Sequence, residues 1–127
     1  MSQANDYVTG SIQRVDLDTG AVTTLYTECD GNRLCGPNDI VFDKDGGLWF
    51  TDLGKTRARE MDRGGVYYAK ADGSYITEVA FPLLMANGIG LSPDGSQLYV
   101  AETDACRLLA WEITGAHWSG PRFFGVR

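Results

Sequence analysis

The stretch that decides the fold is PNDIVFDKDGGLWFTD, residues 37–52, which returns as ANGIGLSPDGSQLYVAE over residues 86–102. Each copy reads as an asparagine, a short apolar strand, an Asp-Gly or similar Gly-containing turn and a second apolar strand that closes on an acid. The offset between Asn38 and Asn87, 87 minus 38, is 49 residues. A repeat of about 40–50 residues made of short strands is typical of a β-propeller blade. We therefore predict an all-β chain and single out the two asparagines.

Further strands are predicted on either side of these two copies. They fall at residues 11–17 and 21–26, at 65–70 and 75–81, and at 107–113, with a weaker final strand at 121–126. Short apolar or alternating runs separated by Thr-Gly and Asp-Gly are typical of hairpins, and no window keeps a helical period. We expect four-stranded antiparallel blades, with residues 40–43 innermost and residues 76–81 outermost in the first complete blade.

The strand count predicts one partial propeller domain over residues 1–127. Residues 8–37 form an outer strand pair and a connection, residues 38–85 a full blade, and residues 86–127 a second blade. Closed propellers use about four to eight blades, and closing the ring removes their open sheet edges. About two and a half blades cannot close such a ring, so we expect either a piece of a longer protein or copies that assemble.

Composition narrows the classes of partner. Seventeen acids against eleven bases give a net charge of −6, and the densest basic segment is the short run at residues 55–59. Nucleic acid is therefore not an expected partner. No apolar run approaches the roughly 18–20 residues that span a bilayer, and residues 1–6 lack a signal-peptide pattern. Three cysteines without a Cys-x-x-Cys pair favour reduced thiols, so we expect a cytoplasmic protein that does not enter the membrane.

The two asparagines are predicted to meet at one mouth of the propeller channel. The first two strands of a blade form a hairpin, so the start of one and the end of the other emerge on the same face. Asn38 is then expected near Asp52, Gly54 and Lys55. Asn87 is expected near Glu102 and Thr103. Amide oxygens from neighbouring blades suit a hard cation such as Ca²⁺. The alternative is that each asparagine is a turn residue that binds its own backbone.

These residues resemble the gluconolactonase family. The resemblance is carried by GPNDIVFD (36–43) with GLWFTD (47–52), and by NGIGLSPDG (87–95) with LYVAET (98–103), and it extends from about residue 8 to residue 113. That family also includes senescence marker protein (regucalcin) and the luciferin-regenerating enzyme. The resemblance implies a six-bladed propeller with a divalent cation in its central channel, and hydrolysis of lactones.

Residue by residue, the resemblance places Asn87 on a metal-ligand asparagine. It places Asn38 on an asparagine that contacts substrate or a metal-bound water, and that binds metal directly in the related paraoxonases. Asn38, Asp39 and Lys55 are the candidate substrate contacts. No match is found for the family's first-blade glutamate ligand or for the later aspartate that is both ligand and proposed general base, so no catalytic residue is assigned. Gly36 stands where some sugar-lactone members carry an arginine.

The resemblance therefore implies a part of a divalent-metal-dependent lactone hydrolase that is inactive as this chain alone. Ca²⁺ is the expected cation, with Zn²⁺, Mn²⁺ or Mg²⁺ as alternatives, and the expected partners are a small-molecule lactone and either the missing blades or further copies of the chain. Two other functions remain open at this point: a non-catalytic metal-binding propeller module, and an oligomerising half-propeller.

Overall fold

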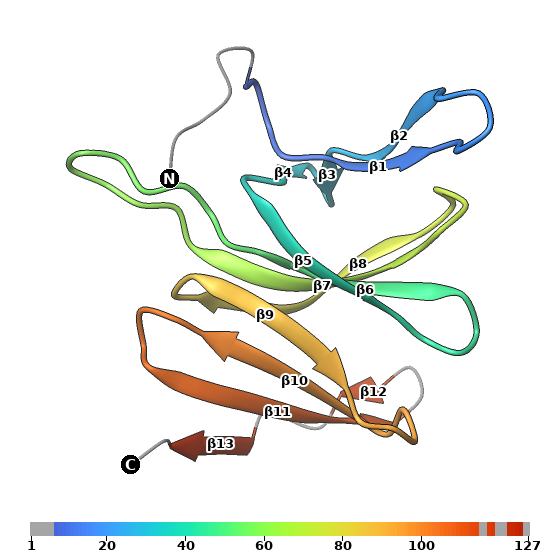
Figure 1. The fold of residues 1–127 in the computed structure, drawn as a ribbon. Helices are drawn as coiled ribbons and strands as arrows, with labels where there is room; N and C mark the ends of the chain where they lie inside the picture. Colours follow the sequence, from blue (N-terminus) through green and yellow to red (C-terminus); the bar gives the residue numbers. More distant parts are fainter. Residues whose placement is uncertain (1–6, 115–116, 119–121, 126–127) are drawn as a thin grey trace.

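A computed structural model describes residues 7–114, 117–118 and 122–125, and over these residues every regular element is a strand (Figure 1). No helix among them is long and apolar enough to cross a membrane. The strands are β1 (Ile12–Val15), β2 (Val22–Tyr26), β3 (Glu28–Cys29), β4 (Asn32–Arg33), β5 (Pro37–Phe42), β6 (Gly47–Asp52), β7 (Gly64–Lys70), β8 (Ile76–Leu83), β9 (Ala86–Leu91), β10 (Gln97–Glu102), β11 (Arg107–Thr114), β12 (His117–Trp118) and β13 (Arg122–Gly125).

The first complete blade is a four-stranded antiparallel sheet in the order β5-β6-β7-β8. This confirms the predicted blade, with β5 on the inner edge and β8 on the outer edge. The second blade repeats the meander as β9-β10-β11, and β12 and β13 both pair with β11. The weak final strand predicted at residues 121–126 corresponds to β13, and its two end residues lie outside the described residues.

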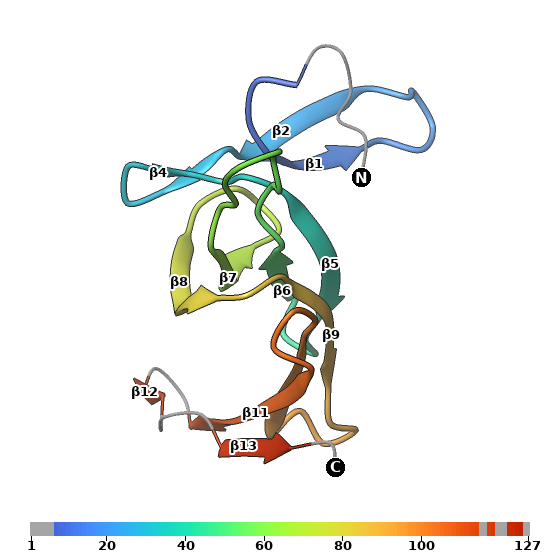
Figure 2. The same cartoon turned by 90° about the vertical axis from the view of Figure 1, so that its left-hand side faces the viewer.

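The outer pair β1–β2 forms a separate two-stranded sheet above the first blade. Figure 2 shows the resulting stack, with the pair, the first blade and the second blade lying one above another. A short hairpin, β3–β4, interrupts the connection that follows the pair. The prediction missed this hairpin, although Asp30-Gly31 marks its turn and both residues have a positive φ, 50° and 79°.

Strand β6 explains why its sequence, GLWFTD, is almost wholly apolar. All six of its residues are buried, because the strand is covered on both faces. Leu48 and Phe50 belong to a cluster shared with Tyr26 of the outer pair, whereas Trp49 belongs to the cluster that joins the first blade to the second. Alternate residues of a strand point to opposite faces, so each blade contributes to two cores.

The inner end of the first blade is less well covered. Ile40 is paired with Phe50 and therefore shares its face, yet Ile40 is 43% exposed and Phe42 on the same side of β5 is 58% exposed. The outer pair covers this face over β6 and β7 and leaves β5 open. The uncovered apolar strip formed by Ile40 and Phe42 is suited to pack against the inner strands of another blade.

Candidate metal and substrate site

Each asparagine begins a β-bulge, and the two bulges are equivalent. In the first blade Pro37 pairs with Asp52 and Ile40 pairs with Phe50, so Asn38 and Asp39 together face one residue of β6. In the second blade Ala86 pairs with Glu102 and Ile89 with Val100, so Asn87 and Gly88 together face one residue of β10. Bulges bend a strand, re-aim its side chains and are frequent beside functional sites. The 49-residue repeat therefore preserves a backbone irregularity as well as a strand pattern.

The closing acid of the first copy holds the chain that enters the first bulge. The carboxylate of Asp52, which is buried, accepts hydrogen bonds from the amides of Cys35 and Gly36, both at 2.6 Å, and of Gly54 at 2.9 Å. Three charge-assisted bonds fix the segment before β5 and the start of the loop after β6. Asp52 was predicted to lie near Asn38, and its carboxylate is occupied by the backbone.

The closing acid of the second copy does the same at the second bulge. Buried Glu102 accepts the amide of Leu84 at 2.7 Å, and Leu84 is the 49-residue equivalent of Cys35. The other oxygen of Glu102 accepts the Arg107 Nε at 2.5 Å. Burial acts to raise the pKa of Glu102, but the Arg107 guanidinium and the Leu84 amide outweigh burial and hold that pKa below its ordinary value. Both closing acids are thus structural residues of the repeat.

The two bulges lie against each other. Strands β5 and β9 run side by side in the same direction (Figure 1). The Thr51 hydroxyl donates to the backbone carbonyl of Asn87 at 2.5 Å and accepts the Asp39 amide at 3.2 Å. The Asp39 carboxylate accepts the Ile89 amide at 3.0 Å and the Ile40 amide at 2.9 Å. Sequence reasoning placed Asp39 near the asparagines but overlooked Thr51, whose position is Ala101 in the second copy.

The asparagine side chains differ in their surroundings. Asn38 is exposed, whereas Asn87 is half-buried and its Nδ2 donates to the Thr103 hydroxyl at 3.2 Å. Because the amide nitrogen of Asn87 is used in this bond, its carbonyl oxygen is the atom left to serve as a ligand. Thr103, which follows the closing acid of the second copy, was predicted to lie near Asn87, and this hydrogen bond confirms it.

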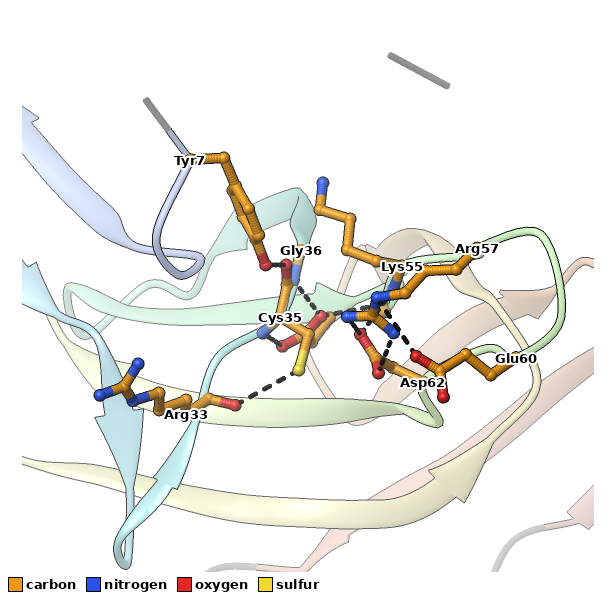
Figure 3. Close-up of polar contacts among 10 residues, drawn as sticks. Tyr7, Arg33, Cys35, Gly36, Lys55, Arg57, Glu60 and Asp62 are labelled. Carbon is orange, nitrogen blue, oxygen red and sulfur yellow. Dashed lines mark hydrogen bonds and ion pairs between the residues drawn. The ribbon is translucent and has the colours of Figure 1, made fainter. Parts of the chain in front are cut away.

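Lys55 lies in the loop between β6 and β7, directly beside the entry to the first bulge. Its Nζ lies 5.0 Å from the centre of the Tyr7 ring, and Figure 3 shows its side chain pointing towards Tyr7 and away from the Arg57–Asp62 pair. A Cβ atom added at Gly36 would lie 3.0 Å from the Gly54 carbonyl oxygen and 3.4 Å from the Lys55 Nζ. The Lys55 ammonium therefore stands over the position of Gly36, and a larger residue there would have to displace it.

The loop that carries Lys55 is held by Asp62. Its carboxylate accepts the Lys55 amide at 3.2 Å and binds the Arg57 guanidinium at 2.8 and 3.2 Å. The hydrogen bond from Arg57 holds the pKa of Asp62 below its ordinary value. A bidentate arginine–carboxylate pair is geometrically specific, so the loop presents Lys55 from a defined backbone.

Cys35 precedes Gly36 in the same entry loop, and its thiol is not activated. Burial, together with the nearby Asp52 and Asp62 carboxylates, raises the pKa of the Cys35 thiol to about 11. A thiol is nucleophilic as its thiolate, so Cys35 is a poor nucleophile near neutral pH. All three cysteines are free thiols in the structure.

The donor set at the bulges consists of neutral oxygens. Across the described residues, no three His, Cys, Asp or Glu side chains gather as a metal-binding group. The Asn87 carbonyl oxygen, oriented through Thr103, and the Asn38 amide supply ligands of the type that Ca²⁺ accepts. These residues therefore fit one part of a hard-cation site. The two asparagines supply no anionic ligand, and the neighbouring Asp39, Asp52 and Glu102 carboxylates each accept backbone amides.

The architecture and the paired bulges define this chain as two blades and an outer strand pair of a β-propeller. A family model for the SMP-30/gluconolactonase/LRE-like region matches residues 7–127. The chain belongs to this family, and the resemblance found in its sequence is thereby confirmed.

Curated relatives agree with this assignment. The lactonase drp35 of Staphylococcus saprophyticus is 41% identical over 101 residues, which are 79% of this chain and 30% of that protein. The gluconolactonase of Zymomonas mobilis is 32% identical over 113 residues, 84% of this chain and 32% of that protein. The chain thus spans about a third of the length of these two relatives.

Solved structures give the same picture. A gluconolactonase from Xanthomonas campestris superposes with a TM-score of 0.74 at 32% identity, over 90% of this chain and 41% of that one. A luciferin-regenerating enzyme superposes with a TM-score of 0.59 at 20% identity, over 81% of this chain and 34% of that one. The second likeness is one of fold.

Proposed function

We propose that this chain is the part of a divalent-metal-dependent lactone hydrolase that supplies the neutral half of the metal site. The observation that carries the proposal is the pair of equivalent bulges, packed against each other, that present Asn38 and Asn87 in a member of a family containing lactonases. Ca²⁺ is the proposed cation because it accepts amide oxygens readily; Zn²⁺, Mn²⁺ and Mg²⁺ are the alternatives to be tested.

Each asparagine has a distinct role in this proposal. Asn87 is the metal ligand, since its amide is oriented by Thr103 so that the carbonyl oxygen remains for the cation. Asn38 is the second, weaker ligand and a contact for the substrate, because its side chain is exposed. When bound, a divalent cation polarises a lactone carbonyl and stabilises the oxyanion that forms on attack by water.

Lys55 is the proposed substrate contact that compensates for the glycine at position 36. Its ammonium stands 3.4 Å from where a Cβ of residue 36 would lie, which is where an arginine side chain would begin. An ammonium group at that point can donate a hydrogen bond to an oxygen of a polar lactone or form an ion pair with a carboxylate. Asp39, the third predicted substrate contact, is the second residue of the bulge that begins at Asn38, and both of its oxygens accept backbone amides.

We infer that the isolated chain has no lactonase activity. A base must take a proton from the attacking water, and the carboxylates nearest the asparagines are engaged by backbone amides. The partner that would complete the site is the remaining set of blades, which the uncovered strip at Ile40 and Phe42 is suited to receive. Association of further copies of the chain through the same strip is the alternative.

Two assays of the purified 127-residue chain test the proposal. Hydrolysis of glucono-δ-lactone is expected at the background rate with or without Ca²⁺, and to appear when the chain is expressed with the further blades of its reading frame. Efficient hydrolysis by a monomer of this chain would contradict the proposal and would direct attention to Asp39, Asp52 and Glu102.

The two alternatives give different results in the same experiments. A non-catalytic metal-binding module would bind Ca²⁺ and hydrolyse no lactone even when all blades are present. An oligomerising half-propeller would show a defined assembly by light scattering, with Ile40→Ser and Phe42→Ser dispersing it.

A further inference from the structure

The inner strand of the second blade, β9, lies at the edge of its sheet, and side chains of the first blade bind the backbone groups of this edge. Within the described residues β9 is the last strand of its sheet, with β10 on one side and no strand on the other. Edge strands present unpaired backbone groups. The Asn87 carbonyl and the Ile89 amide are two such groups, and both bind side chains of the first blade instead of a strand.

The two side chains involved form one connected unit. Thr51 Oγ1 donates to the Asn87 carbonyl at 2.5 Å and accepts the Asp39 amide at 3.2 Å, and Asp39 Oδ2 accepts the Ile89 amide at 3.0 Å. The bonds to Asn87 and Ile89 therefore hold the backbone on either side of Gly88 in the bulge. Thr51 is fully buried, so its hydroxyl has little access to water as a substitute partner.

The second copy of the repeat lacks this pair of side chains. The residues of the second copy at these positions are Gly88 and Ala101, which carry neither a carboxylate nor a hydroxyl. The strands, the bulge and the closing acid repeat, whereas Asp39 and Thr51 do not. A feature needed only for the fold of a blade would be expected in both copies, and this one is confined to the junction between the two asparagines.

We propose that Asp39 and Thr51 are positioning residues, an interblade clasp that fixes the Asn87 bulge against the Asn38 bulge and so sets the spacing of the two amide ligands. The clasp acts through the backbone carbonyl of Asn87 and the backbone amide of Ile89. As a statement about metal affinity it rests on the function proposed above, and as a statement about structure it stands on the hydrogen bonds alone.

Hydrogen exchange without metal tests the clasp itself. Thr51→Val keeps the shape of the side chain and removes the hydroxyl, and the Asp39 amide should then exchange about tenfold faster or more, because it loses its acceptor. Asp39→Ala should have the same effect on the Ile89 amide. Thr51→Ser, which retains the hydroxyl, should keep the Asp39 amide protected. Unchanged exchange of both amides in folded Thr51→Val and Asp39→Ala proteins would overturn the clasp.

Paramagnetic broadening by Mn²⁺ tests its effect on the metal site. In the wild-type chain the NMR signals of the Asn38 and Asn87 side-chain amides should broaden together over one range of Mn²⁺ concentration. Thr51→Val should move this range to about three- to tenfold higher concentration, the effect of losing one hydrogen bond, and Thr51→Ser should restore it. The same Mn²⁺ range in Thr51→Val as in the wild type would overturn the positioning role.

Thr77→Val is the matched control. Thr77 lies on the outermost strand of the same blade, β8, so the same chemical change occurs away from β9. It should leave both amide exchange and the Mn²⁺ range unchanged. If the side-chain amide signals of wild-type Asn38 and Asn87 do not broaden at all, the proposed metal site is wrong. Hydrogen exchange of the Asp39 and Ile89 amides still decides whether the clasp exists.

Discussion

The two bulges have the same backbone pairing and differ in their side chains. Both have the same register shift, and in both the closing acid binds the amide two residues before the inner strand begins. The first bulge carries Asp39 opposite Thr51, and the second carries Gly88 opposite Ala101. The difference teaches that the shared features build each blade, while the unshared polar pair belongs to the junction between blades, where the candidate site lies.

The largest expected difference between the two bulges is in stability. Asp52→Ala leaves three amides, those of Cys35, Gly36 and Gly54, without their acceptor, and we expect a loss of about 4 kcal/mol of unfolding free energy. Glu102→Ala removes the acceptor of one amide and one ion pair of Arg107, and we expect a smaller loss of about 2 kcal/mol. Urea denaturation measures the unfolding free energy of both variants. A larger loss for Glu102→Ala than for Asp52→Ala would contradict this prediction.

The cysteines beside the two bulges should differ in reactivity. A pKa of about 11 for Cys35, against a usual value of 9.0, means roughly a hundredfold less thiolate near pH 8. Cys106, in the turn after the second closing acid, is exposed. Iodoacetamide should therefore modify Cys106 first, as followed by peptide mass spectrometry. Equal rates for the two residues would show that the entry loop of the first blade opens freely.

The second bulge should lose stability in acid. The pKa of Glu102 is lowered in the folded protein from its ordinary value of 4.5, so its ionised form favours folding above that pH. This contribution is lost as the pH falls from about 4.5 through the lowered pKa. Glu102→Gln should be less stable than the wild type at pH 7 and should show a shallower decline below pH 4.5. A decline as steep as in the wild type would assign the acid sensitivity to other carboxylates.

Much of the fold could be predicted from the sequence because it depends on local patterns. Alternation, Asp-Gly turns and the 49-residue repeat were sufficient for the order of β5 to β8. That Asn38 and Asn87 share one site stays a prediction. The β3–β4 hairpin was missed because two-residue strands leave no periodic signal, although its Asp-Gly turn was visible.

The site was less predictable because its decisive contacts join different blades. The bulges cannot be read from the sequence, because an asparagine just before an apolar run is also typical of an ordinary turn. The roles of Thr51 and the two closing acids depend on which backbone groups remain unpaired once the sheets are stacked. Metal binding, the lactone substrate and the predicted cytoplasmic location stay predictions.

Calorimetric titration of Ca²⁺ into the protein that carries all its blades tests the central claim most directly. We expect one high-affinity cation, with Asn87→Ala weakening its binding about tenfold or more and Asn38→Ala weakening it about threefold, because the better oriented ligand contributes more. The control Thr77→Val should bind as the wild type does. Unchanged affinity in both asparagine variants, or a greater loss in Asn38→Ala than in Asn87→Ala, would contradict the account.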